Sequence, residues 1–271
     1  VRGGIPFLAY VFWLGVGAGV TMFVLSLLFR RPPRVTLAHL KCYAVTGTSG
    51  FAIPYAIVAV VVGHGVPSGI MSMVIALAPM MTYLGAVVFR LERAWWLRFL
   101  GLVIGIAGIV LIVAPESSLP SRDLVPWILL ALIVPFCYAT VTIAAIIMRP
   151  PAMDSLSFGA GFFLAPLPIL FVAMLLADEF WVFGGSFGGA EWALVLSGFV
   201  QALGIYLFLE LVRLMGPVFF TTVNFITPLT GILFGMAFFG ERLSFWVLIA
   251  LVPLFLGLFF VILPRGEPKQ Q

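Results

Sequence analysis

The stretch from Tyr206 to Arg242 reads YLFLELVRLMGPVFFTTVNFITPLTGILFGMAFFGER, and its pattern occurs once more, earlier in the chain. Two apolar runs flank a Gly-Pro pair, the second run contains a central Pro, and Gly-Glu-Arg closes it. The earlier copy, Gly65 to Arg93, reads GVPSGIMSMVIALAPMMTYLGAVVFRLER, with its central Pro and closing Glu-Arg at matching positions. Internal symmetry of this kind indicates a duplicated helical unit.

The composition outside this stretch is equally apolar. The chain has 271 residues, of which 63% are hydrophobic and 9% are charged, and its mean hydropathy is +1.23. A bilayer core of about 30 Å needs roughly 20 apolar residues per helix, so the chain is typical of an all-α polytopic membrane protein. Runs between charged or turn-rich breaks predict nine spans, at about 6–29, 40–62, 69–89, 97–114, 126–147, 157–177, 192–212, 218–239 and 244–263.

The two copies align over a long, gap-free segment. At one constant offset the matching pairs are Pro79 and Pro228, Glu92 and Glu241, Gly108 and Gly257, and Pro115 and Pro264. The span at 157–177 then matches that at 6–29, whereas the span at 126–147 has no partner in the first half. We therefore expect two five-helix repeats, 1–115 and 126–264, with the first helix of the first repeat missing from this chain. Because five is odd, the repeats are expected to be inverted relative to each other.

Positive charge predicts the orientation. Eleven of the fourteen Lys and Arg residues fall on one side of the predicted spans, and only Arg2, Arg122 and Arg242 fall on the other. Cytoplasmic loops retain positive charge, so we expect a cytoplasmic C-terminus and an outer N-terminus for this chain. The basic residues are scattered between spans and form no single face, which argues against a nucleic-acid partner. His39 and His64 lie in loops on opposite sides, so neither a metal site nor a cofactor is expected.

The Tyr206–Arg242 stretch, with its Tyr, Gly-Pro turn, mid-helix Pro and closing Gly-Glu, resembles EamA-type members of the drug/metabolite transporter superfamily. The Gly65–Arg93 stretch resembles the same pattern more loosely, and the likeness covers nearly the whole chain. The resemblance implies two five-helix domains, both termini cytoplasmic in a full-length form, export of metabolites such as amino acids or their analogues, and no ATP-hydrolysing domain. The missing helix is a departure, because that helix would help to line the central cavity.

Uncharged polar side chains inside apolar spans are the candidates for a substrate cavity, since such groups are costly in lipid unless they face protein or water. Thr221 and Asn224 share one helix face with Pro228, and Gln201 follows Gly198 on another span. The predicted cavity residues are Asn224, Gln201, Tyr138, Thr142, Thr221, Tyr83, Tyr43 and Thr46. Weaker candidates, for which structural hydrogen bonds of the phenols are the alternative, are Tyr43, Thr46, Tyr83, Tyr55 and Tyr206.

Three further residues could support movement or coupling. Pro79 and Pro228 lie mid-helix, where Pro removes a backbone hydrogen bond, so we expect a bend and assign them as hinges. Glu210 is a carboxylate within an apolar span and a candidate for proton coupling. Arg213 lies three residues further on, and a local ion pair between the two is the structural alternative. Glu92 and Glu241 are expected to cap the helix that follows each of them, or to form a gate contact.

The function predicted from these features is a secondary transporter or facilitator that exports small metabolites, such as amino acids or amphipathic compounds, across the inner membrane. The expected partners are a small-molecule substrate and the lipid bilayer. The sequence does not decide whether the protein forms a homodimer. Translocation of lipid or lipid-linked substrates is the alternative, because fold does not fix function. A membrane enzyme is less favoured, since no cluster of acids or His marks one interface.

Overall fold

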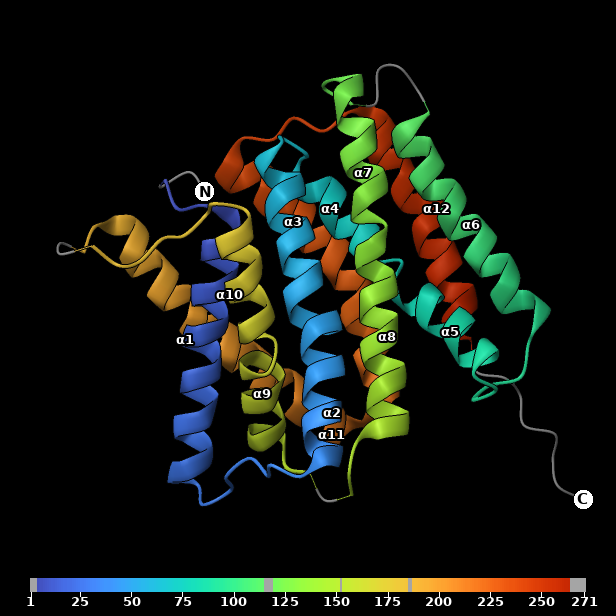
Figure 1. Ribbon diagram of the computed structural model, residues 1–271. Coiled ribbons are helices and arrows are strands. Elements are labelled where there is room, and N and C mark those ends of the chain that lie inside the picture. Colours follow the sequence, from blue (N-terminus) through green and yellow to red (C-terminus); the bar gives the residue numbers. More distant parts are fainter. Residues whose placement is uncertain (1–3, 115–118, 152, 185–186, 264–271) are drawn as a thin grey trace, which may run out of the picture. The chain divides into compact units, whose positions relative to one another are not determined.

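The computed structural model describes residues 4–114, 119–151, 153–184 and 187–263, and it describes the side chains of this set apart from 209 and 211–224. Every regular element in the described part of the chain is helical, as predicted (Figure 1). The helices are α1 (Phe7–Leu28), α2 (Leu37–Gly47), α3 (Ile53–Gly63), α4 (Ser68–Ile75), α5 (Ala78–Val88), α6 (Trp96–Val113), α7 (Val125–Ala131), α8 (Ile133–Met148), α9 (Ser155–Leu164), α10 (Leu167–Leu176), α11 (Gly189–Phe239) and α12 (Phe245–Ile262).

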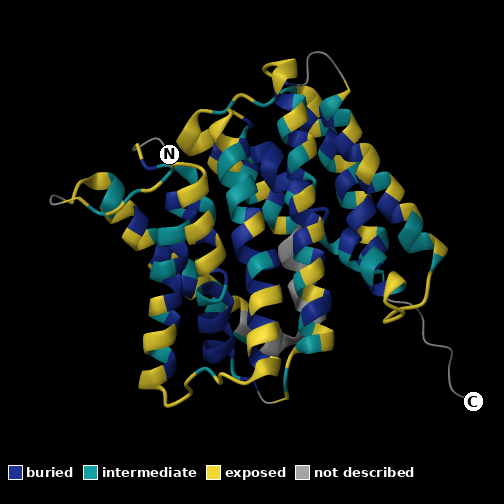
Figure 2. Cartoon of the chain, in the orientation of Figure 1, coloured by how far each residue is buried: buried dark blue, intermediate teal, exposed yellow. Residues whose placement is uncertain are grey.

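Eight segments of the described chain are long and apolar enough to cross a bilayer, and a shorter apolar helix, Phe225–Phe239, adds to them. Large apolar side chains are exposed along these helices, and Figure 2 colours the exposed residues yellow. Leu28, Val103 and Phe238 are examples, with more than 60% of their surface exposed. Such faces suit contact with lipid tails, so the protein is a polytopic helical membrane protein.

Several spans consist of two helices in series. The predicted span 69–89 divides into α4 and α5 at Ala76 and Leu77, just before Pro79. α9 and α10 divide in the same way before Leu167, next to Pro166. Proline suits the first turn of a helix because the missing N–H would have no intrahelical partner there.

α11 differs from the prediction of two spans separated by a loop at Gly216 and Pro217. The backbone is helical from Gly189 to Phe239, a length of 51 residues. At 1.5 Å per residue this is about 76 Å, more than twice the thickness of a bilayer core of about 30 Å. The expected loop was wrong because a single Pro removes only one intrahelical hydrogen bond, a loss that membrane helices tolerate. The two apolar stretches, Gly189–Phe208 and Phe225–Phe239, remain distinct.

The chain forms two compact units, and each draws on both predicted repeats. Unit 1 comprises Val1–Gly65 and Thr140–Phe220, and unit 2 comprises Val66–Ala139 and Thr221–Gln271. α8 and α11 contribute to both. Each unit therefore combines a segment of 1–115 with a segment of 126–264.

Glycines allow close helix packing within each unit. In unit 2, a Cβ added to Gly257 of α12 would lie 2.5 Å from the carbonyl oxygen of Gly101 in α6, so the two backbones touch. In unit 1, a Cβ on Gly15 of α1 would lie 2.6 Å from Phe51, and one on Gly19 would lie 2.6 Å from Leu164 of α9. Small residues at these contacts permit the dense packing that holds helices together in lipid.

Carboxylates satisfy the first backbone amides of two helices. In unit 2, Glu241 accepts hydrogen bonds from the amide of Ser68 (2.7 Å), the hydroxyl of Ser68 (2.9 Å) and the amide of Gly69 (3.2 Å), at the start of α4. In unit 1, Glu179 accepts a hydrogen bond from the amide of Leu8 (2.6 Å), at the start of α1. A carboxylate at a helix N-terminus pairs orphan donors and complements the helix dipole.

The expectation that Glu241 caps the helix that follows it was therefore wrong. The following helix, α12, is capped by Ser244, whose hydroxyl accepts from the amide of Trp246. Glu92, the residue at the repeat-equivalent position, forms an ion pair with Arg98 in the first turn of α6. Because Ser244 accepts the hydrogen bond at the start of α12, the carboxylate of Glu241 can accept those at the start of α4.

We predict that Glu241→Ala lowers the free energy of unfolding by about 1–3 kcal/mol, since two amides and a hydroxyl at the start of α4 lose a charged acceptor. Glu92→Ala is the matched control, because its partly exposed ion pair contributes about 0–1 kcal/mol. Unfolding of purified protein in detergent, followed by tryptophan fluorescence, measures both changes. Equal losses for the two variants would contradict the capping role of Glu241.

Candidate functional site

A polar pair connects two membrane-spanning segments inside unit 1. The side-chain amide of Gln201 in α11 donates a hydrogen bond to the hydroxyl of Tyr55 in α3, at 2.5 Å. Both residues are half-buried. The Tyr55 ring packs on Phe51, with 4.9 Å between ring centroids. An uncharged polar pair with apolar neighbours can offer donors and acceptors to a neutral or zwitterionic molecule.

Close backbone contact positions the Gln201 side chain. A Cβ added to Gly198 would lie 3.1 Å from the Cα of Gly17, so α11 and α1 touch at two glycines. Gln201 follows Gly198 by three residues and therefore lies on the same side of α11. The predicted common face of these two residues thus lies in the interior of unit 1, where Gln201 reaches Tyr55.

The segment that joins α2 to α3 is a π-helical turn, Thr48–Ala52, which the sequence analysis missed. It packs tightly against α9, since a Cβ on Gly47 would lie 2.2 Å from the carbonyl oxygen of Phe162. Thr46 and Ser49 donate hydrogen bonds to carbonyls one turn back, those of Cys42 and Val45, each at 2.6 Å. Single π-turns are frequent at functional sites, and this one leads directly into the helix that carries Tyr55.

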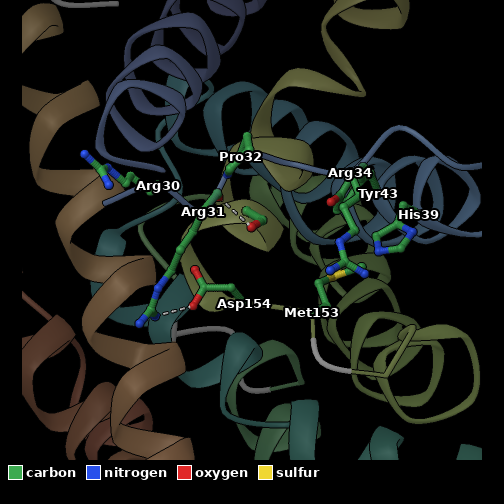
Figure 3. Close-up of a pocket in the computed structure, with 9 residues that line it drawn as sticks. Arg30, Arg31, Pro32, Arg34, His39, Tyr43, Met153 and Asp154 are labelled. Carbon is green, nitrogen blue, oxygen red and sulfur yellow. Dashed lines mark hydrogen bonds and ion pairs between the residues drawn. The ribbon is translucent and has the colours of Figure 1, made fainter. Parts of the chain in front are cut away.

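A cavity of about 480 Å³ lies at the opposite end of α2 from this turn, also within unit 1 (Figure 3). Its walls come from the α1–α2 loop, the first turns of α2, the segment before α9 and the first turn of α9. Arg30 turns the chain after α1 in the left-handed conformation, with φ at 57°. The lining residues are Arg30, Arg31, Pro32, Arg34, His39, Tyr43, Met153, Asp154 and Ser157.

Two of the predicted cavity residues lie one helical turn apart in α2. Tyr43 is 3% exposed, lines this cavity, and its hydroxyl has no hydrogen-bond partner among the described residues. Thr46 is fully buried, and its hydroxyl is bonded to its own helix. Tyr43 is thus placed to contact a ligand, whereas Thr46 is occupied by the backbone.

The remaining tyrosine and threonine candidates are separated. In unit 2, the hydroxyl of Tyr83 accepts a hydrogen bond from the amide of Trp95 (2.8 Å) and donates one to its carbonyl (3.3 Å), which fixes the loop before α6 and favours the structural alternative. Tyr138 and Thr142 lie one turn apart in α8, but Tyr138 belongs to unit 2 and Thr142 to unit 1. Tyr138 is half-buried and Thr142 is exposed.

The hinge and coupling candidates remain predictions. Pro79 lies in the first turn of α5, directly after the division of the span. Pro228 is buried within α11, and its carbonyl accepts a hydrogen bond from Ser72 at 3.3 Å. Glu210 is half-buried in α11, and the side chain of its predicted partner, Arg213, lies outside the described residues. The side chains of Thr221 and Asn224 lie outside them too.

Three site residues were underestimated or missed by the sequence analysis. Tyr55 ranked only as a weak candidate, although its position in an apolar span was a usable signal. Arg34 was interpreted as a topology signal, and nothing in the sequence indicated that Asp154 would reach the α1–α2 loop. Among the described residues no group of three His, Cys, Asp or Glu side chains could hold a metal ion.

Comparison with known proteins agrees with this architecture. The model of the EamA-like transporter family matches residues 1–114 and 125–263. The chain belongs to the EamA-like transporter family. It is also similar to the uncharacterized inner membrane transporter YedA of Escherichia coli K12, with 29% identity over 241 residues, which cover 88% of this chain and 74% of the relative. YedA of the O6:H1 and O157:H7 strains matches equally well. Family membership and the name of this relative indicate a membrane transporter.

We predict that Gln201 and Tyr55 stabilise unit 1 jointly. Gln201→Leu and Tyr55→Phe should each lower the free energy of unfolding. The double variant should lose less stability than the two single variants added together, with a coupling energy of about 0.5–1.5 kcal/mol. Thermal unfolding in detergent measures the three variants. Ser197→Ala is the control, because that hydroxyl donates its hydrogen bond to the carbonyl of Ala193, one turn back in the same helix. Additive losses would show that the hydrogen bond has no energetic role.

Proposed function

We propose that this EamA-like protein is a secondary transporter or facilitator that exports small neutral or zwitterionic metabolites, such as amino acids or amphipathic compounds, across the inner membrane. Family membership supports transport, and the printed name of the YedA relative supports the inner membrane. The direction of transport rests on the resemblance to EamA-type exporters. The observation that carries the choice of cargo is the uncharged Gln201–Tyr55 pair inside the apolar spans of unit 1.

The distribution of charge supports the same cargo class. Among the described side chains, the basic residues that belong to helices lie near helix starts, with Lys41 fifth in α2 and Arg98 third in α6. A phosphorylated cargo would call for arginine or lysine deep in a span, where the cost of charge must be offset by the cargo. Polar groups such as Gln201 and Tyr55 suit a cargo whose charges cancel.

Orientation forms part of the proposal. The excess of Lys and Arg on one side places the C-terminus in the cytoplasm. We predict that a C-terminal green fluorescent protein fusion fluoresces, whereas a C-terminal alkaline phosphatase fusion, which needs export for its disulfides, has little activity. Fusions after Gly65 and after Arg93, on predicted opposite sides, serve as internal controls. An active phosphatase at the C-terminus would contradict the orientation.

Transport itself is tested in proteoliposomes loaded with labelled amino acids. We predict saturable release from vesicles with the wild-type protein, and about tenfold slower release for Gln201→Leu at low substrate concentration, since one hydrogen bond to the cargo is lost. Ser197→Ala, on the same helix, should match the wild type. Vesicles without protein give the background rate.

Two results would contradict the proposal. Release equal to background for every amino acid tested would exclude this cargo class, and the same vesicles would then be assayed for movement of a fluorescent phospholipid, the alternative cargo. Unchanged release by Gln201→Leu, with normal release by the wild type, would instead exclude the Gln201–Tyr55 pair as the cargo contact.

A further inference from the structure

The cavity at the start of α2 is strongly basic. Arg30, Arg31 and Arg34 line it, against one acidic side chain, Asp154. Figure 3 shows that Arg31 extends to Asp154, whereas Arg34 lies on the other side of the cavity, beside His39 and Tyr43. The lining therefore carries an excess of positive charge, which favours an anionic ligand.

Arg31 forms an ion pair with Asp154, the acidic side chain of the lining. The positive charges of Arg30 and Arg34 are therefore not neutralised by it. The Arg31 guanidinium is 2.7 Å from the Asp154 carboxylate, which also accepts a hydrogen bond from the amide of Leu156 (2.9 Å) and so caps α9. The hydroxyl of Ser157 donates to the carbonyl of Arg31 at 2.9 Å. In the part of the chain that the structure describes, Arg30 and Arg34 form no ion pair.

The Tyr43 hydroxyl is a second and independent indication of a ligand. Only 3% of this residue is exposed, it lines the cavity, and its hydroxyl finds no partner among the described residues. A buried hydroxyl without a hydrogen bond is unfavourable by about 1–3 kcal/mol, so native proteins rarely keep one. An acceptor oxygen within the cavity would satisfy this donor.

The helices around the cavity favour the same charge. α2 and α9 both begin there, and the positive ends of their dipoles attract anions. Their first amides are partly satisfied by Thr36 and Asp154, so these helix ends contribute a field and the arginines supply the contacts. The cavity also lies where the apolar span of α1 ends, at the level of lipid headgroups if α1 spans the bilayer.

We propose that this cavity binds a phosphate group at the membrane surface, held by Arg34 with a hydrogen bond from Tyr43. Guanidinium groups match the geometry of phosphate oxygens and bind them in bidentate fashion. Basic pockets between membrane helices on the cytoplasmic side are typical sites for anionic headgroups. The phosphate belongs either to a phospholipid or to a soluble phosphate ester. The site is separate from the Gln201–Tyr55 pair and does not depend on the proposed cargo.

The test measures binding to the purified full chain in a nonionic detergent. Phosphatidylglycerol supplies the phosphate in a lipid, glycerol 1-phosphate supplies it in solution, and dioleoylglycerol is the lipid without phosphate. We expect the wild type to bind at least one phosphate compound and to be stabilised by it against heat, with no such effect of dioleoylglycerol. Stabilisation by phosphatidylglycerol alone identifies a headgroup site, and stabilisation by both identifies a site for soluble esters.

Two variants and a control assign the binding to the cavity. Arg34→Gln and Tyr43→Phe should each weaken affinity by about tenfold, the effect of one lost hydrogen bond to a charged group. Tyr43→Phe should leave the ligand-free protein at least as heat-stable as the wild type, because it removes an unpaired hydroxyl. Arg93→Gln, an exposed arginine of unit 2, should bind like the wild type.

Three results would overturn the proposal. Dioleoylglycerol could stabilise the protein as well as phosphatidylglycerol does, which would show an apolar effect. Arg34→Gln and Tyr43→Phe could bind both phosphate compounds with wild-type affinity, which would place the phosphate elsewhere. Arg93→Gln could weaken binding as much as Arg34→Gln, which would show that only net charge matters.

Discussion

The backbone of a membrane protein must find its hydrogen-bond partners within the protein, because the bilayer core offers no water. Each start of a span and each interruption within a span leaves free backbone groups that need partners. Glu241 accepts hydrogen bonds from backbone amides at the start of α4, and Glu179 accepts one at the start of α1. Prolines lie beside the breaks before α5 and α10, where an N–H would be left unpaired. The arrangement of carboxylates and prolines follows from this one requirement.

The span pattern could be predicted from the sequence because hydropathy is a local property. A bend near Pro79 could also be expected, since proline acts on its own helix. The π-turn at Thr48–Ala52 could not, because its close neighbour Phe162 belongs to a helix distant in sequence. The loop expected at Gly216 was predicted from turn-forming residues alone, and helical residues on both sides outweighed that preference.

The candidate site was predictable only in part, for the same reason. Gln201 could be identified because an amide in an apolar run needs a partner, but the identity of that partner, Tyr55, depends on tertiary packing. The arginine-lined cavity was missed because Arg31 and Asp154 are 123 residues apart in sequence. Positive charges beside spans carry topological information in any membrane protein, so a binding role for Arg34 is evident only beside the buried hydroxyl of Tyr43.

The interleaving of the two halves has a consequence for biogenesis. When residues 1–139 have left the ribosome, unit 1 still lacks Thr140–Phe220 and unit 2 lacks Thr221–Gln271. The nascent chain therefore holds part of each unit in the bilayer, and the glycine face of α6 lacks its partner until α12 is made. The early helices must stay inserted without these partners while the second half of each unit is translated.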